Sequence, residues 1–327
     1  MSEVALRLRP HRGLHLVARH ASLAALLVLI AFNAAVTPHF LSWQTLSVNL
    51  TQVTTTIIVA VGMTLVIATG GIDLSVGSLM AIAGALAPEI FLGKIVALPE
   101  IVAVPLAFVV PVALAGALGW CNGLLVTRYR VQPIVATLIL FIAGRGLAQV
   151  ATDGKLQTFH VPSFQAIGVG QVGGVPVQVL LMLALAAAAA WTVRRTVFGR
   201  HLLAVGGNER AAHLAGVPVE RVKRTAYVIS GLCAGLAGLI VIAINSSSDA
   251  NAVGMGVELD AIAAVAVGGT LLSGGRASIV GTLIGALIIQ TVRYMLLANG
   301  VPDAAAMVVK AGLIIVAVGL QRQGSRG

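Results

Sequence analysis

The stretch IIVAVGMTLVIATGGIDLSVGSLMAIAGALAP, residues 57–88, decides the fold, because it is apolar almost throughout and contains one charged residue, Asp73. A helix that spans a bilayer needs about 20 mostly apolar residues, so the stretch belongs to membrane helices. A charge at the centre of a spanning helix costs at least about 2.5 kcal/mol. Asp73 therefore marks a turn, a polar cavity or a functional site.

The composition of the whole chain supports this interpretation. Hydrophobic residues make up 58% and charged residues 10% of the 327 residues, and the mean hydropathy is +0.99. A soluble globular protein has about 25% charged residues, so we expect a polytopic membrane protein. The net charge of +10 is not gathered into a soluble basic patch, which argues against a nucleic-acid partner. Cys121 and Cys233 lie in apolar segments without metal-ligand spacing and are predicted to be packing residues.

Hydropathy predicts an all-α fold of about ten transmembrane helices. Most of the 21 Lys and Arg residues fall in the segments that alternation places inside, so both termini are expected to be cytoplasmic. The pairs Gly119/Gly123, Gly231/Gly235 and Gly281/Gly285 are predicted to allow close helix packing. The predicted spans are residues 20–38, 51–69, 74–92, 101–125, 131–151, 176–193, 225–244, 257–272, 277–298 and 304–320.

These spans divide the chain into a basic tail (1–19), one membrane domain (20–320) and a short tail (321–327). The arginines at 7, 9, 12 and 19 imitate the start of a signal peptide, but the apolar run continues through Ala34–Val36 without a cleavage site. We therefore expect an uncleaved first helix. The longest hydrophilic stretch, 194–224, is too short for a soluble domain, so energetic work would need a partner.

The hydrophilic loop 194–224 contains the signals of a short helix. Asn208 can cap a helix from Glu209 to Ala215, and Glu209 suits the positive end of that helix. Gly216 followed by Pro218 can end it. The alternative is a solvated basic loop that only fixes the topology.

Several segments together resemble the permease subunits of bacterial ATP-binding-cassette importers for monosaccharides, the ribose-type group. Residues 143–149 (AGRGLAQ) and 258–262 (ELDAI) look most similar to permeases of galactofuranose importers. The segments that carry the resemblance are 62–67 (GMTLVI), 70–77 (GGIDLSVG), 132–138 (QPIVATL), 144–146 (GRG), 207–209 (GNE) and 262–270 (IAAVAVGGT).

The resemblance implies that the loop helix couples the membrane domain to a cytoplasmic ATPase. Arg210 departs from the pattern, since relatives often have a small residue there. The implied complex contains a second permease subunit (a copy or a paralogue), a cytoplasmic ABC ATPase that holds ATP and Mg²⁺, and a periplasmic sugar-binding protein. This chain would bind no cofactor and would lie in the bacterial inner membrane. The implied coupling residues are Gly207, Asn208, Glu209, Arg210, Ala211, Ala212 and Gly216.

The motif LSGGR at 272–276 imitates an ATPase signature, but the chain has no Gly-x-x-x-x-Gly-Lys-Ser/Thr to hold phosphates. We therefore expect a transport subunit rather than an enzyme. The sequence also shows no reactive set for an intramembrane enzyme. A secondary transporter driven by an ion gradient fits the composition equally well, and only the loop and the resemblance argue against it.

Polar residues inside the spans are candidates for the translocation path. The charges of Arg145, Glu258, Asp260, Arg293 and Lys310, with Gln149 and Gln290, either pair with one another or form a polar mouth. Gly70, Gly71, Asp73 and Ser75 form the predicted helix break, where Asp73 is expected to cap a helix starting at Leu74 rather than to bind sugar. The possible path residues are Thr64, Thr69, Asn122, Gln132, Thr137, Arg145, Gln149 and Asp260.

Overall fold

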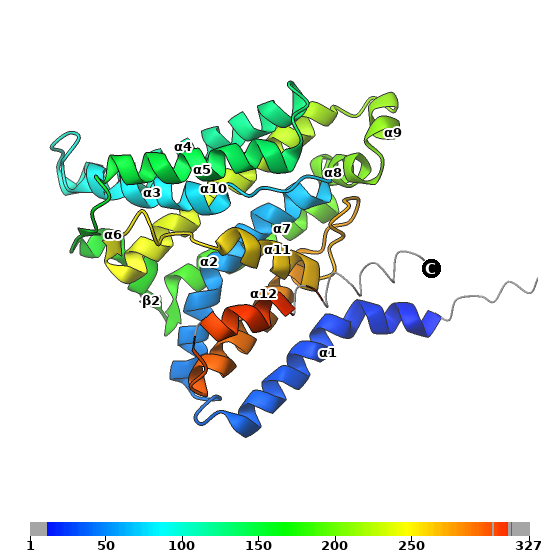
Figure 1. Cartoon of the computed structure of the whole chain (residues 1–327), viewed down its shortest axis with the longest axis horizontal. Coiled ribbons are helices and arrows are strands. Elements are labelled where there is room, and N and C mark those ends of the chain that lie inside the picture. The colour runs from blue at the N-terminus through cyan, green and yellow to red at the C-terminus, as the bar shows by residue number, and fades with distance from the viewer. Residues whose placement is uncertain (1–11, 303, 313–314, 316–327) are drawn as a thin grey trace, which may run out of the picture.

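The computed structural model describes residues 12–302, 304–312 and 315, with side chains from residue 22 onward, and it is almost entirely helical (Figure 1). The helices are α1 (Arg12–Val36), α2 (Trp43–Ala68), α3 (Val76–Phe91), α4 (Glu100–Thr127), α5 (Pro133–Ala151), α6 (Pro162–Val169), α7 (Val177–Arg195), α8 (Val197–Gly207), α9 (Glu209–Leu214), α10 (Val219–Asn245), α11 (Val257–Val267) and α12 (Ile279–Ala298). Residues 304–312 are also helical.

Six of the described helices are long and apolar enough to cross a bilayer: α2, α4, α5, α7, α10 and α12. Residues 22–36 of α1 and all of α3 are shorter apolar helices. α1 begins at Arg12, so part of the predicted N-terminal tail is helical. Residues 1–11, the C-terminal tail and most of the last predicted span beyond residue 312 lie outside the described part of the chain.

The prediction of a helical span over 257–272 is wrong in its length. α11 covers only 11 residues and ends at Val267, so it rises about 16 Å against a hydrocarbon core of about 30 Å. Gly269, with φ +82°, turns the chain out of the helix, and a non-helical segment leads on to α12. The polypeptide therefore continues from α11 to α12 as irregular backbone.

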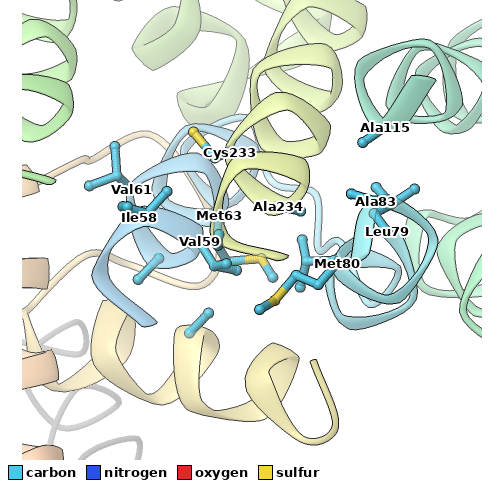
Figure 2. Close-up of a cluster of buried hydrophobic side chains, with 14 of the residues drawn as sticks. Ile58, Val59, Val61, Met63, Leu79, Met80, Ala83, Ala115, Cys233 and Ala234 are labelled. Atoms are coloured by element: carbon cyan, nitrogen blue, oxygen red, sulfur yellow. The ribbon is translucent and has the colours of Figure 1, made fainter. Parts of the chain in front are cut away.

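α2 lies at the centre of the bundle, where it contacts α7, α10, α11 and α12. In its most apolar 18 residues, 72% are buried, compared with 22% in α5. Figure 2 shows the surrounding core, in which Met63 of α2 and Met80 of α3 lie near Ala234 of α10. Cys233 is buried in this core but Cys121 is exposed, so the packing prediction was correct for Cys233 only.

Glycines bring α4 and α10 into backbone contact, as the sequence predicted. A Cβ added to Gly119 would lie 2.3 Å from the carbonyl oxygen of Tyr227, and one added to Gly231 would lie 2.3 Å from that of Ala115. Gly285 of α12 packs in the same way against α11, since a Cβ added to it would lie 2.2 Å from the carbonyl oxygen of Ala264. Small residues at these crossings allow the helices to approach closely within the lipid bilayer, which provides no hydrophobic driving force for helix association.

A small cap covers the end of the bundle where α3 meets α4, and the sequence did not predict it. It contains α6 and an antiparallel pair formed by β1 (Gln157–Thr158) and β4 (Ser247–Ser248). Phe164 of α6 is fully buried and stacks on Phe108 of α4, with ring centroids 4.8 Å apart. A second pair, β2 (Gln171–Val172) with β3 (Val175–Pro176), leads into α7.

Candidate functional site

The glycine pair at 70–71 ends α2, as predicted. Gly70 has φ +80°, a conformation that glycine adopts without steric cost, and its N–H donates to the carbonyl of Ile67 at 2.8 Å. The N–H of Gly71 donates to Val66 at 3.2 Å. A Cβ on Gly71 would lie 2.7 Å from the hydroxyl oxygen of Tyr227, so this turn is packed directly against α10.

Asp73 is completely buried and is hydrogen-bonded within the chain. Its Oδ1 accepts from the backbone N–H of Ser75 at 3.0 Å and from the Ser75 hydroxyl at 2.6 Å. Its Oδ2 accepts from the hydroxyl of Ser230 at 2.8 Å. Three donors from the protein therefore solvate the carboxylate in place of water.

The predicted helix start at Leu74 was wrong, because α3 begins at Val76 with Ser75 as its N-cap residue. Asp73 bonds to the amide two residues further along, which makes an Asx turn, and this turn delays the helix. Asp73 still satisfies a backbone N–H beside the first turn of α3, although it is not the N-cap.

The break at residues 69–75 is also tied to two further helices. The Asn122 amide of α4 donates to the hydroxyl oxygen of Ser75 at 2.9 Å. Tyr227 of α10 and Thr137 of α5 each donate to the carbonyl of Ile72 at 3.4 Å. Ser230 and Tyr227 were not predicted, although their spacing of three places them on one face of an apolar helix, which is a readable signal.

Most of the predicted path residues take part in bonds that hold the helices together. Thr64 is buried, donates to the carbonyl of Ala60 at 2.7 Å and lies 2.9 Å from the hydroxyl of Thr282. Thr69 is buried and donates to the carbonyl of Val66 at 2.7 Å. Gln132 is exposed and directly precedes α5. Asn122 and Thr137 are bonded to the break, as described above.

Arg145 and Gln149, one turn apart on α5, hold the segment before α11. Arg145 Nη1 donates to the carbonyls of Ala250 at 2.8 Å and Val253 at 2.6 Å, and Gln149 donates to Asn251 at 2.7 Å. Glu258 lies close by: a Cβ on Gly77 would be 2.5 Å from its Oε2, and this oxygen is buried without a hydrogen-bond partner among the described residues.

Asp260 pairs with Lys310 at 2.5 Å, so the predicted pairing of opposite charges is confirmed for these two residues. The pair borders a polar cavity of about 40 Å³, which has room for a few water molecules but not for a sugar. Within it, the Gln290 amide donates to Gln52 at 2.7 Å. The lining residues are Gln52, Val53, Thr56, Asp260, Ala286, Ile289, Gln290, Arg293 and Lys310.

The hydrophilic loop forms two helices, of which the sequence predicted the second. The Asn208 side chain accepts from the N–H of Ala211 at 2.9 Å, so Asn208 caps α9 as expected. α9 ends at Leu214, and Gly216 follows with φ +80°. The sequence did not predict α8. One residue, Thr196, separates α8 from α7, and its side chain caps α8.

α9 presents an exposed surface. Ala212 faces inward and is buried, whereas Arg210 and Ala211 are exposed and Leu214 is 83% exposed. Gly207, Asn208 and Gly216 are exposed as well. Glu209 forms an ion pair with Lys223 of α10 at 2.5 Å, which joins α9 to α10.

Comparisons with known proteins identify the family. Residues 45–318 match the family described as the permease component of branched-chain amino acid transport systems. The chain is 43% identical over 301 residues to the ribose import permease protein of Escherichia coli (strain K12), covering 91% of each chain. It is 40% identical over 312 residues to the galactofuranose transporter permease protein of the same strain, covering 92% of this chain and 89% of the relative.

A third relative is the L-arabinose ABC transporter permease protein of Azospirillum brasilense, which is 34% identical over 303 residues and covers 93% of this chain and 87% of the relative. No solved structure matches the chain. The resemblance to importer permeases is therefore confirmed, and the chain belongs to the family of transport-system permease components, which are polytopic membrane proteins.

Proposed function

We propose that this chain is the membrane permease subunit of an ATP-driven monosaccharide importer of the bacterial inner membrane. The observation that carries the proposal is its identity of 40% or more to two sugar import permeases over about nine tenths of each chain. The ribose and galactofuranose relatives match almost equally well, so the identities do not favour galactofuranose. We therefore propose a monosaccharide as the substrate class.

We assign the contact with the ATPase to α8 and α9 of this chain. Support comes from the capped helix α9, which exposes Arg210, Ala211 and Leu214 while Ala212 anchors it. An exposed large apolar residue such as Leu214, on the same helix as the cation Arg210, is suited to dock into a groove of another protein, because burial of its apolar surface is favourable. Energy would come from ATP and Mg²⁺ on that partner, and this chain would bind neither.

For the topology we propose ten crossings with both termini cytoplasmic. The crossing at α11 would be completed by the irregular segment between α11 and α12. Irregular backbone is tolerated at membrane depth only where protein or a water-filled cavity surrounds it, and Gly275 of this segment donates to the carbonyl of Ala68 at 3.0 Å. A second permease subunit, a copy or a paralogue, would complete the channel, and a periplasmic sugar-binding protein would load it.

For the sugar path we propose the polar cavity beside Asp260, with Arg145 and Gln149 holding its outer surroundings. Amide and carboxylate groups such as those of Gln52, Gln290 and Asp260 are suitable partners for sugar hydroxyls. The cavity would have to widen for a sugar to pass. Thr64, Asn122 and Thr137 would hold helices together rather than contact the sugar. Thr69, whose hydroxyl bonds to its own helix, and the exposed Gln132 are not assigned a sugar contact.

The proposal is tested by purifying the chain with its ATPase and binding protein and reconstituting the complex in proteoliposomes. D-ribose, galactofuranose, L-arabinose and D-fructose are offered with ATP inside or outside the membrane. We expect import of one of these sugars only when ATP and an active ATPase are present. Import that persists without ATP and stops when an ionophore removes the ion gradients would support a secondary transporter instead.

A further inference from the structure

Three segments that are far apart in the sequence meet at the C-terminal end of α2. The N–H of Gly275 donates to the carbonyl of Ala68 at 3.0 Å. A Cβ added to Gly206, near the end of α8, would lie 1.8 Å from the same carbonyl oxygen and 2.4 Å from the nitrogen of Gly275. The backbones of α8, α2 and the turn before α12 therefore touch with no side chain between them.

Gly274 extends this contact to the break itself. A Cβ on Gly274 would lie 2.8 Å from the nitrogen of Gly70 and 2.9 Å from the carbonyl oxygen of Gly206. The turn is thus packed between Gly70 of the break and the end of α8. Contacts between backbones are stiff, because no rotatable side chain is present to absorb a displacement.

The helix on the other side of α9 holds the same break. Tyr227 and Ser230 of α10 bond to Ile72 and Asp73 at 3.4 and 2.8 Å. The two helices that flank α9 therefore both contact residues 68–73: α8 meets Ala68, the last residue of α2, through Gly206, and α10 bonds to Ile72 and Asp73 through its two hydroxyls. Figure 1 shows α8 and α9 together at one end of the bundle, at the right of the view.

We propose that the break at residues 69–75 is where movement of α8 and α9 enters the membrane helices, and that Gly206 is the positioning residue for this step. The inference rests on the proposed function, since it needs an ATPase that moves α9. A break is suited to the task because non-helical residues can absorb large changes in φ and ψ, whereas the helices beside it move as rigid bodies. Displacement of α8 would then change the angle between α2 and α3.

The chain offers a matched pair of variants for the test. Gly206→Ala places a methyl group against the backbone of Ala68, whereas a Cβ on Gly146 of α5 meets nothing within 4 Å. Both are substitutions of glycine by alanine within helices, so both change helix propensity in the same direction. The difference between them isolates the contact.

Both variants are reconstituted with the ATPase and the binding protein, and the sugar that the wild-type complex imports is used as the probe. We expect Gly206→Ala to retain the ATPase subunit and its hydrolysis of ATP, while the sugar imported per ATP falls about tenfold or more, because roughly 1 Å of misplacement is enough for such losses. Gly146→Ala should keep the wild-type ratio. An unchanged ratio in Gly206→Ala, or loss of ATPase binding together with import, would overturn the inference.

If Gly206→Ala does not accumulate in the membrane, the sugar imported per ATP is measured in Ser230→Ala instead. This variant removes the hydrogen bond from α10 to Asp73 and leaves the glycines intact. Ser247→Ala, whose hydroxyl donates to the carbonyl of Asn245 at 3.2 Å, is its control. A normal ratio in Ser230→Ala overturns the inference, and a lowered one supports it. Failure of the proposed function would be visible separately, as import by the wild-type complex that does not need ATP.

Discussion

Asp73 and Ser230 are 157 positions apart, yet Asp73 Oδ2 accepts a hydrogen bond from the Ser230 hydroxyl at 2.8 Å. This bond joins the break between α2 and α3 to the middle of α10. Asp73 is the one charged residue in the apolar stretch 57–88, and its side chain is fully buried among its donors. It therefore helps to hold α2, α3 and α10 together.

Replacing Asp73 tests whether this role is structural. Asp73→Ala leaves the Ser75 and Ser230 hydroxyls and the Ser75 amide without their acceptor, and each unsatisfied buried group costs about 1–3 kcal/mol. We expect a clear loss of thermal stability in detergent. Asp73→Asn keeps an acceptor oxygen and should retain more of the stability and the import. A stable Asp73→Ala variant, with an inactive Asp73→Asn variant, would instead make the carboxylate a ligand-binding group.

Reversing the charge of Glu209 tests the role of α9. Glu209→Lys breaks the ion pair with Lys223 and places a cation in the positive first turn of α9, so we expect ATPase binding and import to fall together. The matched control is Glu220→Lys, which breaks the exposed pair with Arg224 but lies in α10. Co-purification of the ATPase gives the readout. Equal retention by both variants would remove α9 from the coupling contact.

The pair between Asp260 and Lys310 predicts a coupled effect on stability. The two side chains are 20% and 23% exposed, so removing one partner leaves a charge that is only partly solvated. We expect Asp260→Asn and Lys310→Met each to destabilise the protein, and the double variant to lose less than the sum. The coupling free energy should be about 0.5–3 kcal/mol, toward the lower end because solvent screens the pair. Additive losses in thermal unfolding would show that the pair contributes nothing.

The polar cavity predicts an effect on import rate. Gln290→Leu removes the amide that donates to Gln52 while keeping a similar volume, so the cavity loses a partner for sugar hydroxyls. We expect maximal import to fall severalfold with the protein still folded. Thr291→Val is the control, because Thr291 lies next in the chain, bonds to the carbonyl of Leu287 and does not line this cavity. Equal import rates in the two variants would place the path elsewhere.

The features that could be predicted from the sequence have local causes. Gly70 ends α2 because its φ of +80° suits glycine, and Asn208 caps α9 because its side chain reaches an amide three residues along. Apolar length likewise predicted the long helices, and glycine spacing predicted which helix faces allow close packing, although not that α4 packs on α10. Each of these signals is read within a few residues or one helix face.

The features that were missed depend on distant partners or on a continuous apolar pattern. The bond of Ser230 to Asp73 cannot be read from either local sequence. α11 was predicted too long because residues 268–272 are uncharged and mostly apolar. In the structure Gly268 packs against Gly281 of α12, and a Cβ added to Gly268 would lie 2.4 Å from the Gly281 backbone. α8 was taken for loop because Gly199, Arg200 and His201 interrupt its apolar pattern.

The measurement that tests the central claim most directly is the import of a labelled monosaccharide by proteoliposomes that contain this chain, its ATPase and its binding protein. The assay compares active ATPase with an ATPase variant that binds but does not hydrolyse ATP, each with and without an ionophore that dissipates ion gradients. The account predicts import that requires ATP hydrolysis and is unaffected by the ionophore. Import that continues with the inactive ATPase and disappears with the ionophore would contradict it.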